Sequence, residues 1–320
     1  MLVLLLGAVG GAWLRLAHLR DQPGPLAAAR DVVVPHGGLD QVTMQLADAG
    51  VIDDRLVFRI AVWLSKADGP LRAAEFNFPA HSSMAQAMTI LRTAKPVMHH
   101  ATIPEGLTAH QIVPLLNHLD ATSGSVQMLE EGSLLPETYA YEYGTTRAAL
   151  VARAKAAMAR ELDANWGSRA QGLPLSSPRD ALILASIVER ETSKPEERPH
   201  VASVYLNRLR RGMKLQADPT VVFGASGGTG VLGHKLTRAE LDRDDPFNTY
   251  RNTGLPPAPI CMPGLASLKA VMHPAVSDDL YFVADGTGGH VFAATREAHE
   301  KNVLRWREVE ISKLPHGSPD

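Results

Sequence analysis

The chain has 320 residues, of which 45% are hydrophobic and 21% charged, so it can bury the core of one large domain or two ordinary ones. This composition excludes a disordered chain, a collagen-like fibre and a small disulfide-stabilised scaffold. A formal net charge of −2 and the absence of long basic runs argue against nucleic acid as a partner.

The cysteine and histidine content argues against a metal site. Cys261 is the only cysteine in the sequence, so neither an internal disulfide nor a CxxC metal site can form. The 13 histidines show no HExxH motif and no regular ligand spacing. We therefore expect no metal and no cofactor.

The chain begins with an apolar segment, LVLLLGAVGGAWL at 2–14, which is followed by basic residues and a linker-like stretch. Thirteen apolar residues fall short of the roughly 18–20 that cross a bilayer. A buried core helix and a membrane segment whose beginning is missing both remain open. The glycines disfavour a soluble helix, so we expect residues 1–30 to form an N-terminal membrane anchor, with a truncated start as a hypothesis, and a linker.

A small module is expected over residues 31–97. The sequence predicts a strand at 32–34 and an amphipathic helix at 39–49, with Gly50 in the position of a C-cap glycine. A second helix at 54–65, a strand in AAEFNF and a helix from Ser83 to Arg92 follow. A module with this strand-helix-helix-strand-helix order could stand alone as a binding domain.

Residues 98–320 have the pattern of a mixed α+β domain. A strand is expected at 101–103, and Thr108 is expected to cap the next helix. The segment 130–146 is rich in turn residues, and 146–162 is helical in pattern.

The most informative helix begins at Ser177, which caps it, with Pro178 in the first position. In the run that follows, Glu191 is spaced to lie in the middle of an apolar stripe, whereas Glu189 lies away from its centre. A carboxyl group on a buried stripe is costly unless it is protonated, paired or lining a cavity. Desolvation raises its pKa, as a general acid for glycosidic bond cleavage requires. The alternatives are that Glu191 is an ordinary solvated residue or forms an ion pair with Arg190, Lys194 or Arg198.

The next helix is expected to end at Gly212, with basic residues on a solvated face: Arg208, Arg210 and Arg211. The segment 213–221 has the pattern of an extended stretch whose polar face carries Gln216 and Asp218. The alternative is a turn capped by Asp218 ahead of a proline.

Two further segments follow toward the C-terminal end of the sequence. The proline-rich loop GLPPAPICMPG at 254–264 is of a kind that is more often functional than not. Beyond it, LYFVADGTGGHVFAATREAHEKN predicts a strand, a glycine-rich turn, a second strand and a helix capped at Thr295. The turn lacks the Lys-Ser/Thr of a P-loop, so phosphate binding is not expected.

Five sequence motifs, which occur along the chain in the order found in the family, resemble one family, the endolytic murein transglycosylases (MltG, YceG-like). They are EGSLLPETY, VERET, VASVYLNRLRRGMKLQADPTVVFG, DPFNTYRNTGLPPAPI-MPG and LYFVADGTGGHVF. The resemblance covers roughly residues 31–310. It implies a LysM-like α/β subdomain at 31–97 ahead of a transglycosylase catalytic domain at 98–320. It also implies a single-pass protein of the bacterial inner membrane, anchored through its N-terminal segment, with the catalytic domain in the periplasm.

The resemblance implies a lyase that cuts nascent peptidoglycan strands internally, between MurNAc and GlcNAc, leaves 1,6-anhydroMurNAc ends and so terminates elongation. Glu191 matches the catalytic acid/base of the VExET-type motif, and Glu189 is the supporting or reserve candidate. The matched motifs also imply four substrate-binding residues: Gln216, Asp218, Asn248 and Tyr250. The implied partners are glycan strands and peptidoglycan synthases (penicillin-binding proteins).

One carboxyl group suffices for such a reaction if it serves first as acid and then as base, with the MurNAc 6-hydroxyl attacking C1 in place of water. Two alternatives remain open, and a third, a plain soluble α+β domain without a cell-wall role, is disfavoured by the anchor-like start and the ordered set of motifs. A muramidase would use the same Glu191 with Asp218 or Glu189 holding a water molecule. A non-catalytic regulator of peptidoglycan synthases would bind glycan without cleaving it.

Overall fold

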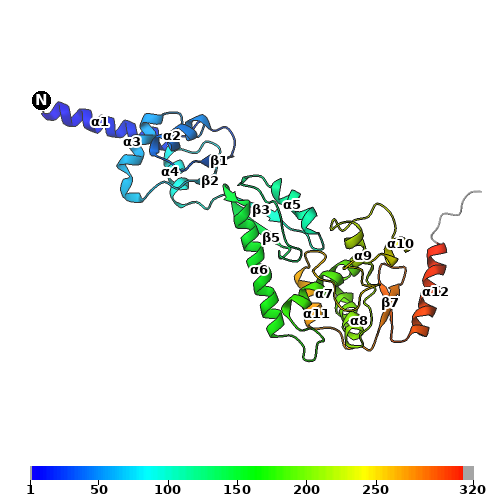
Figure 1. Cartoon of the computed structure of the whole chain (residues 1–320). Helices are drawn as coiled ribbons and strands as arrows, with labels where there is room; N and C mark the ends of the chain where they lie inside the picture. The colour runs from blue at the N-terminus through cyan, green and yellow to red at the C-terminus, as the bar shows by residue number, and fades with distance from the viewer. Residues whose placement is uncertain (1, 313–320) are drawn as a thin grey trace, which may run out of the picture. The chain divides into compact units, whose positions relative to one another are not determined.

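The computed structural model describes residues 2–312, and the chain divides into two compact units (Figure 1). Unit 1 runs to His100 and includes 121–123 and 140–145, and unit 2 contains the remaining described residues. The strands of the described chain form four two-stranded sheets. Helices joined to small sheets confirm the mixed α+β class.

Unit 1 begins with helix α1 (Leu2–Asp21), which contacts helices α3 and α4 of the same unit. Over the part of the chain that the structure describes, no helix combines the length and the apolar character needed to cross a bilayer. The predicted anchor at 1–30 is therefore not confirmed, and Met1 lies outside the described residues.

The strand-helix-helix-strand-helix order predicted after residue 31 is present in unit 1. Its elements are β1 (Arg30–Val34), α2 (Leu39–Asp48), α3 (Arg55–Leu64), the short 3₁₀ turn η1 (Lys66–Asp68), β2 (Ala74–Phe78) and α4 (Met84–Thr93). Strands β1 and β2 pair antiparallel, with Val32 opposite Phe76. Both side chains are buried in the core of this unit. Gly50 has a φ of 72°, as a residue directly after a helix C-cap requires.

The division between the units falls within a pair of strands, β3 (Met98–Thr102) and β5 (Thr138–Glu142). The strand expected at 101–103 is β3, which begins three residues earlier, at Met98. Strands β4 (Thr122–Ser123) and β6 (Thr145–Thr146) form a second short pair. The segment 130–146, for which the sequence predicted only turns, contains strands β5 and β6. In β5, alternate residues such as Tyr139 and Tyr141 are buried, so one face of the strand packs on the core.

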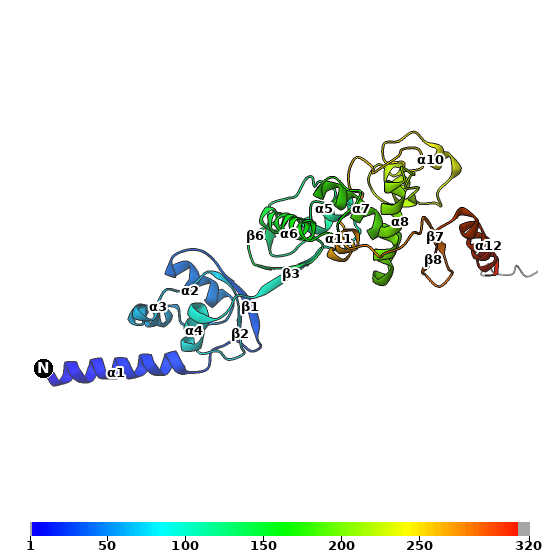
Figure 2. The same ribbon diagram turned by 90° about the horizontal axis from the view of Figure 1, so that it is seen from below.

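Unit 2 is mainly helical (Figure 2). Its helices are α5 (Ala109–Asn117), α6 (Arg147–Gly167), α7 (Pro178–Glu191), α8 (Arg198–Arg210), α9 (Asp218–Ala225), α10 (Arg238–Asp242), α11 (Leu265–Met272) and α12 (Arg296–Ser312), with the 3₁₀ turn η2 (Pro195–Glu197) before α8. Helix α7 contacts α6, α8, α9 and α11, and most of its side chains lie in the hydrophobic core. It is therefore a rigid support for any group at its end.

An antiparallel hairpin, β7 (Tyr281–Ala284) and β8 (His290–Ala293), precedes α12, and α12 contacts both strands. This is the strand-turn-strand-helix order that the sequence predicts, and Thr295 caps α12 by accepting a hydrogen bond from the Ala298 N–H at 3.2 Å. The prediction of an extended stretch at 213–221 is wrong in its second half, because α9 begins at Asp218. Pro219 occupies the first turn of that helix, where it needs no N–H partner.

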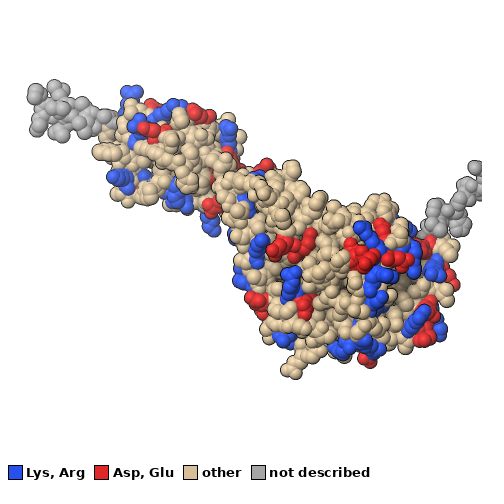
Figure 3. Space-filling view, in the orientation of Figure 1, with Lys and Arg blue, Asp and Glu red and all other residues tan. Residues whose placement is uncertain are grey.

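On the face shown in Figure 3, the charged side chains form no single-sign field. Acidic and basic side chains are interspersed there on each unit. This pattern agrees with the near-neutral net charge of −2.

Candidate active site

The candidate acid, Glu191, is the last residue of α7. The helix begins as predicted, because the Ser177 hydroxyl accepts a hydrogen bond from the Asp180 N–H at 3.2 Å and Pro178 fills the first position. The stripe that leads to Glu191 is fully buried at Leu184 and Ile187. Glu191 itself is half-buried. The helix therefore runs through the core and ends with a carboxyl group at the edge of a cavity.

The surroundings of Glu191 favour its neutral form. Burial raises the pKa of Glu191 to about 7, and the charge of Asp218 acts in the same direction. The Tyr205 hydroxyl, which donates a hydrogen bond to Glu191 Oε1, and the charge of Arg208 both oppose this rise. A carboxyl group poised near neutral pH can both give and take a proton.

None of the alternative ion pairs of Glu191 forms among the described residues. Arg190 donates instead to the backbone oxygens of Gly106 and Gly230, at 3.1 and 3.0 Å. Arg198 pairs with Glu189. The carboxyl group of Glu191 is thus held by a neutral donor, which leaves it free to change its protonation state.

Glu191 borders two cavities of unit 2. The first has a volume of about 170 Å³ and is lined by Glu191, Tyr205, Arg208, Leu215, Gln216, Asp218, Tyr250 and Phe282. The second, of about 360 Å³, lies against the glycine-rich turn of the β7–β8 hairpin and includes His290 and Trp306. A carboxyl group between two cavities can meet a chain-like ligand that extends in both directions from the reacting bond.

Asp218 and Tyr250, two of the residues that the family resemblance implies as substrate-binding, lie together in the smaller cavity. The Tyr250 hydroxyl donates to Asp218 Oδ1 at 2.5 Å. Burial raises the pKa of Tyr250, and the hydrogen bond and charge of Asp218 raise it further. Tyr250 therefore stays protonated and holds the exposed Asp218 carboxylate in place.

Gln216 lines the same cavity from an unusual backbone conformation. Its φ of 51° lies in the left-handed region, which a residue with a side chain rarely adopts. Two contacts hold it there, because its N–H donates to the Thr249 oxygen at 3.1 Å and its Oε1 accepts from Arg208 at 3.3 Å. Strain of this kind, when the surroundings maintain it, is typical of functional sites.

Asn248 does not join the cavity lining. Its side chain is buried, with 1% of its surface exposed. Its amide nitrogen donates to the backbone oxygens of Leu241 and Arg243 at 3.0 and 2.8 Å, and its oxygen accepts from the Tyr250 N–H at 3.0 Å. Asn248 therefore positions Tyr250 and lines neither cavity of Glu191.

Glu189 lines neither cavity. Its side chain is 4% exposed and pairs with Arg198 at 2.9 Å. Its second oxygen accepts the Gly264 N–H at 2.9 Å. Glu189 therefore fastens α7 to the start of α8 and to the end of the proline-rich loop, which itself packs on α7 through Ile260 and Cys261.

The prediction that Arg208 lies on a solvated face is wrong. The residue is 8% exposed, and its guanidinium donates to the backbone oxygens of Leu280 and Leu215 at 2.6 and 2.7 Å. Arg210 and Arg211 are exposed, as expected. Arg208 follows Tyr205 by three residues on α8, so both side chains reach the same cavity.

A second carboxyl group shows that a raised pKa alone does not mark a site. Burial raises the pKa of Glu131 to about 7, although the group accepts the Ala109 N–H at 2.8 Å. Glu131 lines neither cavity at Glu191. Residues 2–312 contain no group of three or more His, Cys, Asp or Glu side chains that could hold a metal ion.

The model of the YceG-like family matches residues 32–305, which contain Glu191 and every residue that lines the smaller cavity. The chain belongs to this family. A 2.6 Å crystal structure of a yceG-like protein from Listeria monocytogenes is similar, with a TM-score of 0.52 and 28% identity over 86% of this chain and 99% of that one.

Two relatives of this YceG-like chain are named endolytic murein transglycosylase. The protein of Streptococcus pneumoniae is 29% identical over 324 residues, which cover 85% of this chain and 57% of that protein. The protein of Bacillus subtilis is 35% identical over 171 residues, which cover 53% of this chain and 46% of that protein. The matched regions thus span about half the length of these relatives.

Proposed function

We propose that this protein is an endolytic murein transglycosylase, which cleaves the bond between MurNAc and GlcNAc within a peptidoglycan strand. The observation that carries the proposal is Glu191, a carboxyl group with a pKa of about 7 that borders two cavities. The names of the relatives in Streptococcus pneumoniae and Bacillus subtilis support the same chemistry.

In the first step, Glu191 acts as a general acid. Its raised pKa keeps a large fraction of the carboxyl group protonated at neutral pH. The proton passes to the glycosidic oxygen as the bond to C1 of MurNAc breaks. Tyr205, which already donates to Glu191, stabilises the carboxylate that this transfer leaves.

In the second step, the ionised Glu191 acts as a general base. It takes the proton of the MurNAc 6-hydroxyl while that oxygen attacks C1, which closes a 1,6-anhydro ring without using water. Because the attacking hydroxyl belongs to the same sugar, the step is intramolecular and has a large entropic advantage over attack by water. Glu191 is then protonated again and ready for the next bond.

The test is the digestion of purified glycan strands by Glu191→Gln, read by product mass. Glutamine is neutral and cannot exchange the proton, so we expect turnover to fall at least a hundredfold with the fold intact. Glu131→Gln is the matched control, because it makes the same change in a carboxyl group of similar pKa outside both cavities. Unchanged turnover by Glu191→Gln would overturn the assignment.

Hydrolysis is the second candidate, because Asp218 places another carboxylate in the cavity of Glu191. Asp218 is exposed and could hold a water molecule at C1, as in a muramidase. The products decide, since a hydrolytic end is heavier than the anhydro end by one water. Glycan binding without any product would instead indicate a non-catalytic regulator of peptidoglycan synthases.

We also propose that residues 1–30 anchor the protein to the bacterial inner membrane, with the catalytic unit in the periplasm beside the synthases. The apolar segment at 2–14 supports this proposal. The module at 31–97 is proposed to be LysM-like and to bind glycan, on the basis of its β-α-α-β order with antiparallel strands. Recovery of the full chain in the soluble fraction after cell lysis would contradict the anchor.

A further inference from the structure

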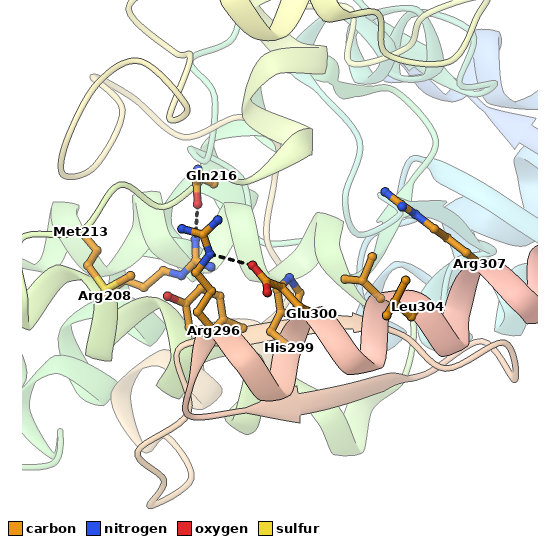
Figure 4. A pocket seen from close by; sticks show the side chains of 10 residues that line it. Arg208, Met213, Gln216, Arg296, His299, Glu300, Leu304 and Arg307 are labelled. Atoms are coloured by element: carbon orange, nitrogen blue, oxygen red, sulfur yellow. Dashed lines mark hydrogen bonds and ion pairs between the residues drawn. The ribbon is translucent and has the colours of Figure 1, made fainter.

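A third cavity of unit 2, which we call the α12 cavity, adjoins the site of Glu191. It has a volume of about 700 Å³, within the range of pockets that enclose drug-sized ligands. Arg208 and Gln216 line both this cavity and the smaller cavity of Glu191. Figure 4 shows these two side chains facing a row that projects from α12: Arg296, His299, Glu300, Leu304 and Arg307. Because the two cavities share these residues, a substituent of a sugar bound at Glu191 can enter the α12 cavity.

The lining of the α12 cavity is positively charged. Three of the lining residues are arginines, and Glu300 is the one carboxylate among those lining residues. Glu300 pairs with Arg296 at 2.9 Å, whereas no acidic side chain of the described chain forms an ion pair with Arg307. Burial lowers the pKa of His299, and the charge of Arg208 lowers it further, so its ring is neutral at pH 7. The positive charge of the cavity lining therefore comes from its arginines, and it does not change near neutral pH.

The same cavity also offers apolar surface. Met213 lies on one side of it, and Val303 and Leu304 project from α12. Leu304 is 58% exposed, so its side chain is accessible to a ligand in the cavity. The matching ligand carries carboxylates together with small apolar groups, as a short acidic peptide does.

We propose that the α12 cavity binds the acidic peptide that MurNAc carries on its lactyl group, and that the enzyme therefore prefers peptide-bearing strands to naked glycan. This inference rests on the proposed function. The peptide begins at the sugar whose C1 reacts at Glu191, and the shared residues Arg208 and Gln216 connect the two cavities. The arginines of α12 meet its carboxylates and the apolar side chains meet its methyl groups.

The test compares cleavage of two preparations of the same strands, one with peptides and one from which an amidase has removed them. We expect wild-type kcat/KM to be about tenfold higher for peptide-bearing strands. Arg307→Ala and Arg296→Ala should each lower that preference about fivefold, through loss of a charge-assisted contact. Glu300→Gln should increase it, because it removes the one negative charge of the lining. Arg305→Ala is the matched control, an exposed arginine of the same helix outside the cavity.

The outcomes separate this inference from the proposed function. Equal cleavage of the two preparations, or an equal loss of preference in Arg305→Ala, overturns the peptide site and leaves the transglycosylase intact. If wild type cleaves neither preparation, the proposed function fails, and calorimetry with soluble muramyl tetrapeptide decides about the cavity. Binding that Arg307→Ala weakens about fivefold supports the site, and absence of binding by wild type overturns it.

Discussion

Replacement of Glu191 by glutamine should stabilise the protein at alkaline pH. Burial raises the pKa of Glu191 from 4.5 to about 7, so the folded state binds this proton more tightly than the unfolded state does. A pKa raised in the folded state gives stability that is complete below pH 4.5 and lost as the pH rises through 7. Glutamine resembles the protonated form at every pH and avoids that loss.

The magnitude follows from the size of the pKa difference. Each tenfold change in protonation corresponds to about 1.4 kcal/mol, so the wild type loses at most about 3 kcal/mol between pH 4.5 and 8. Because Glu191 is half-buried at the edge of a cavity, water stabilises its charged form and reduces the loss. We expect Glu191→Gln to be within about 1 kcal/mol of wild type at pH 5 and to be more stable by about 1–3 kcal/mol at pH 8, with the difference increasing between these pH values.

Urea unfolding at a series of pH values measures this difference. Replacing Trp13 and Trp63 by Phe leaves Trp166 and Trp306 as fluorescence reporters of unit 2. A difference between Glu191→Gln and wild type that stays constant from pH 5 to 8, or that favours wild type at pH 8, would refute the assigned pKa.

Glu189→Gln provides the contrasting control on the same helix. It removes the partner of Arg198, whose side chain is only 9% exposed, and an unpaired buried charge is strongly destabilising. Glu105 lies 3.4 Å from the same guanidinium and compensates in part. We therefore expect Glu189→Gln to be less stable than wild type by about 2–3 kcal/mol at every pH from 5 to 8.

Two further variants test how the site is held. Tyr205→Phe removes a hydrogen bond to the charged form of Glu191, so the alkaline limb of kcat/KM against pH should move from about 7 upward by roughly one pH unit. Asn248→Ala removes the acceptor of the Tyr250 N–H and leaves buried loop carbonyls without a donor. We expect it to raise KM for glycan strands and to cost about 1–3 kcal/mol in urea unfolding.

Each variant has a control that makes the same chemical change elsewhere. Tyr139→Phe removes a buried hydroxyl that donates to the Leu135 oxygen at 2.7 Å, away from both cavities of Glu191, and should leave the pH profile in place. Asn252→Ala removes an exposed amide of the loop that contains Asn248, and should leave KM unchanged. An alkaline limb that stays in place in Tyr205→Phe contradicts the role given to the hydroxyl.

Local signals in the sequence predicted the helix of the site well. The start of α7 depends on Ser177 and Pro178, and its buried face depends on the spacing of Leu184, Ile187 and Glu191. All of these interactions lie within one helix of 14 residues and its N-cap, so a local sequence pattern contains them. The same holds for the β7–β8 hairpin and the helix after it.

The contacts of Tyr205 and Arg208 with Glu191 could not be predicted from a local pattern, although the burial of these two residues could. Tyr205 and Arg208 continue the apolar face of α8, which begins at Val201 and Val204, so they are spaced at i, i+3, i+4 and i+7 on a buried stripe. That spacing is the signal that distinguishes Arg208 from its solvated neighbours, and it is the same signal that identified Glu191. Which partner a buried polar group meets depends on how α7 and α8 pack, and this is a tertiary contact. A sequence with polar residues on the apolar stripes of two successive helices therefore predicts that those residues share one site, although it does not say which of them is the acid.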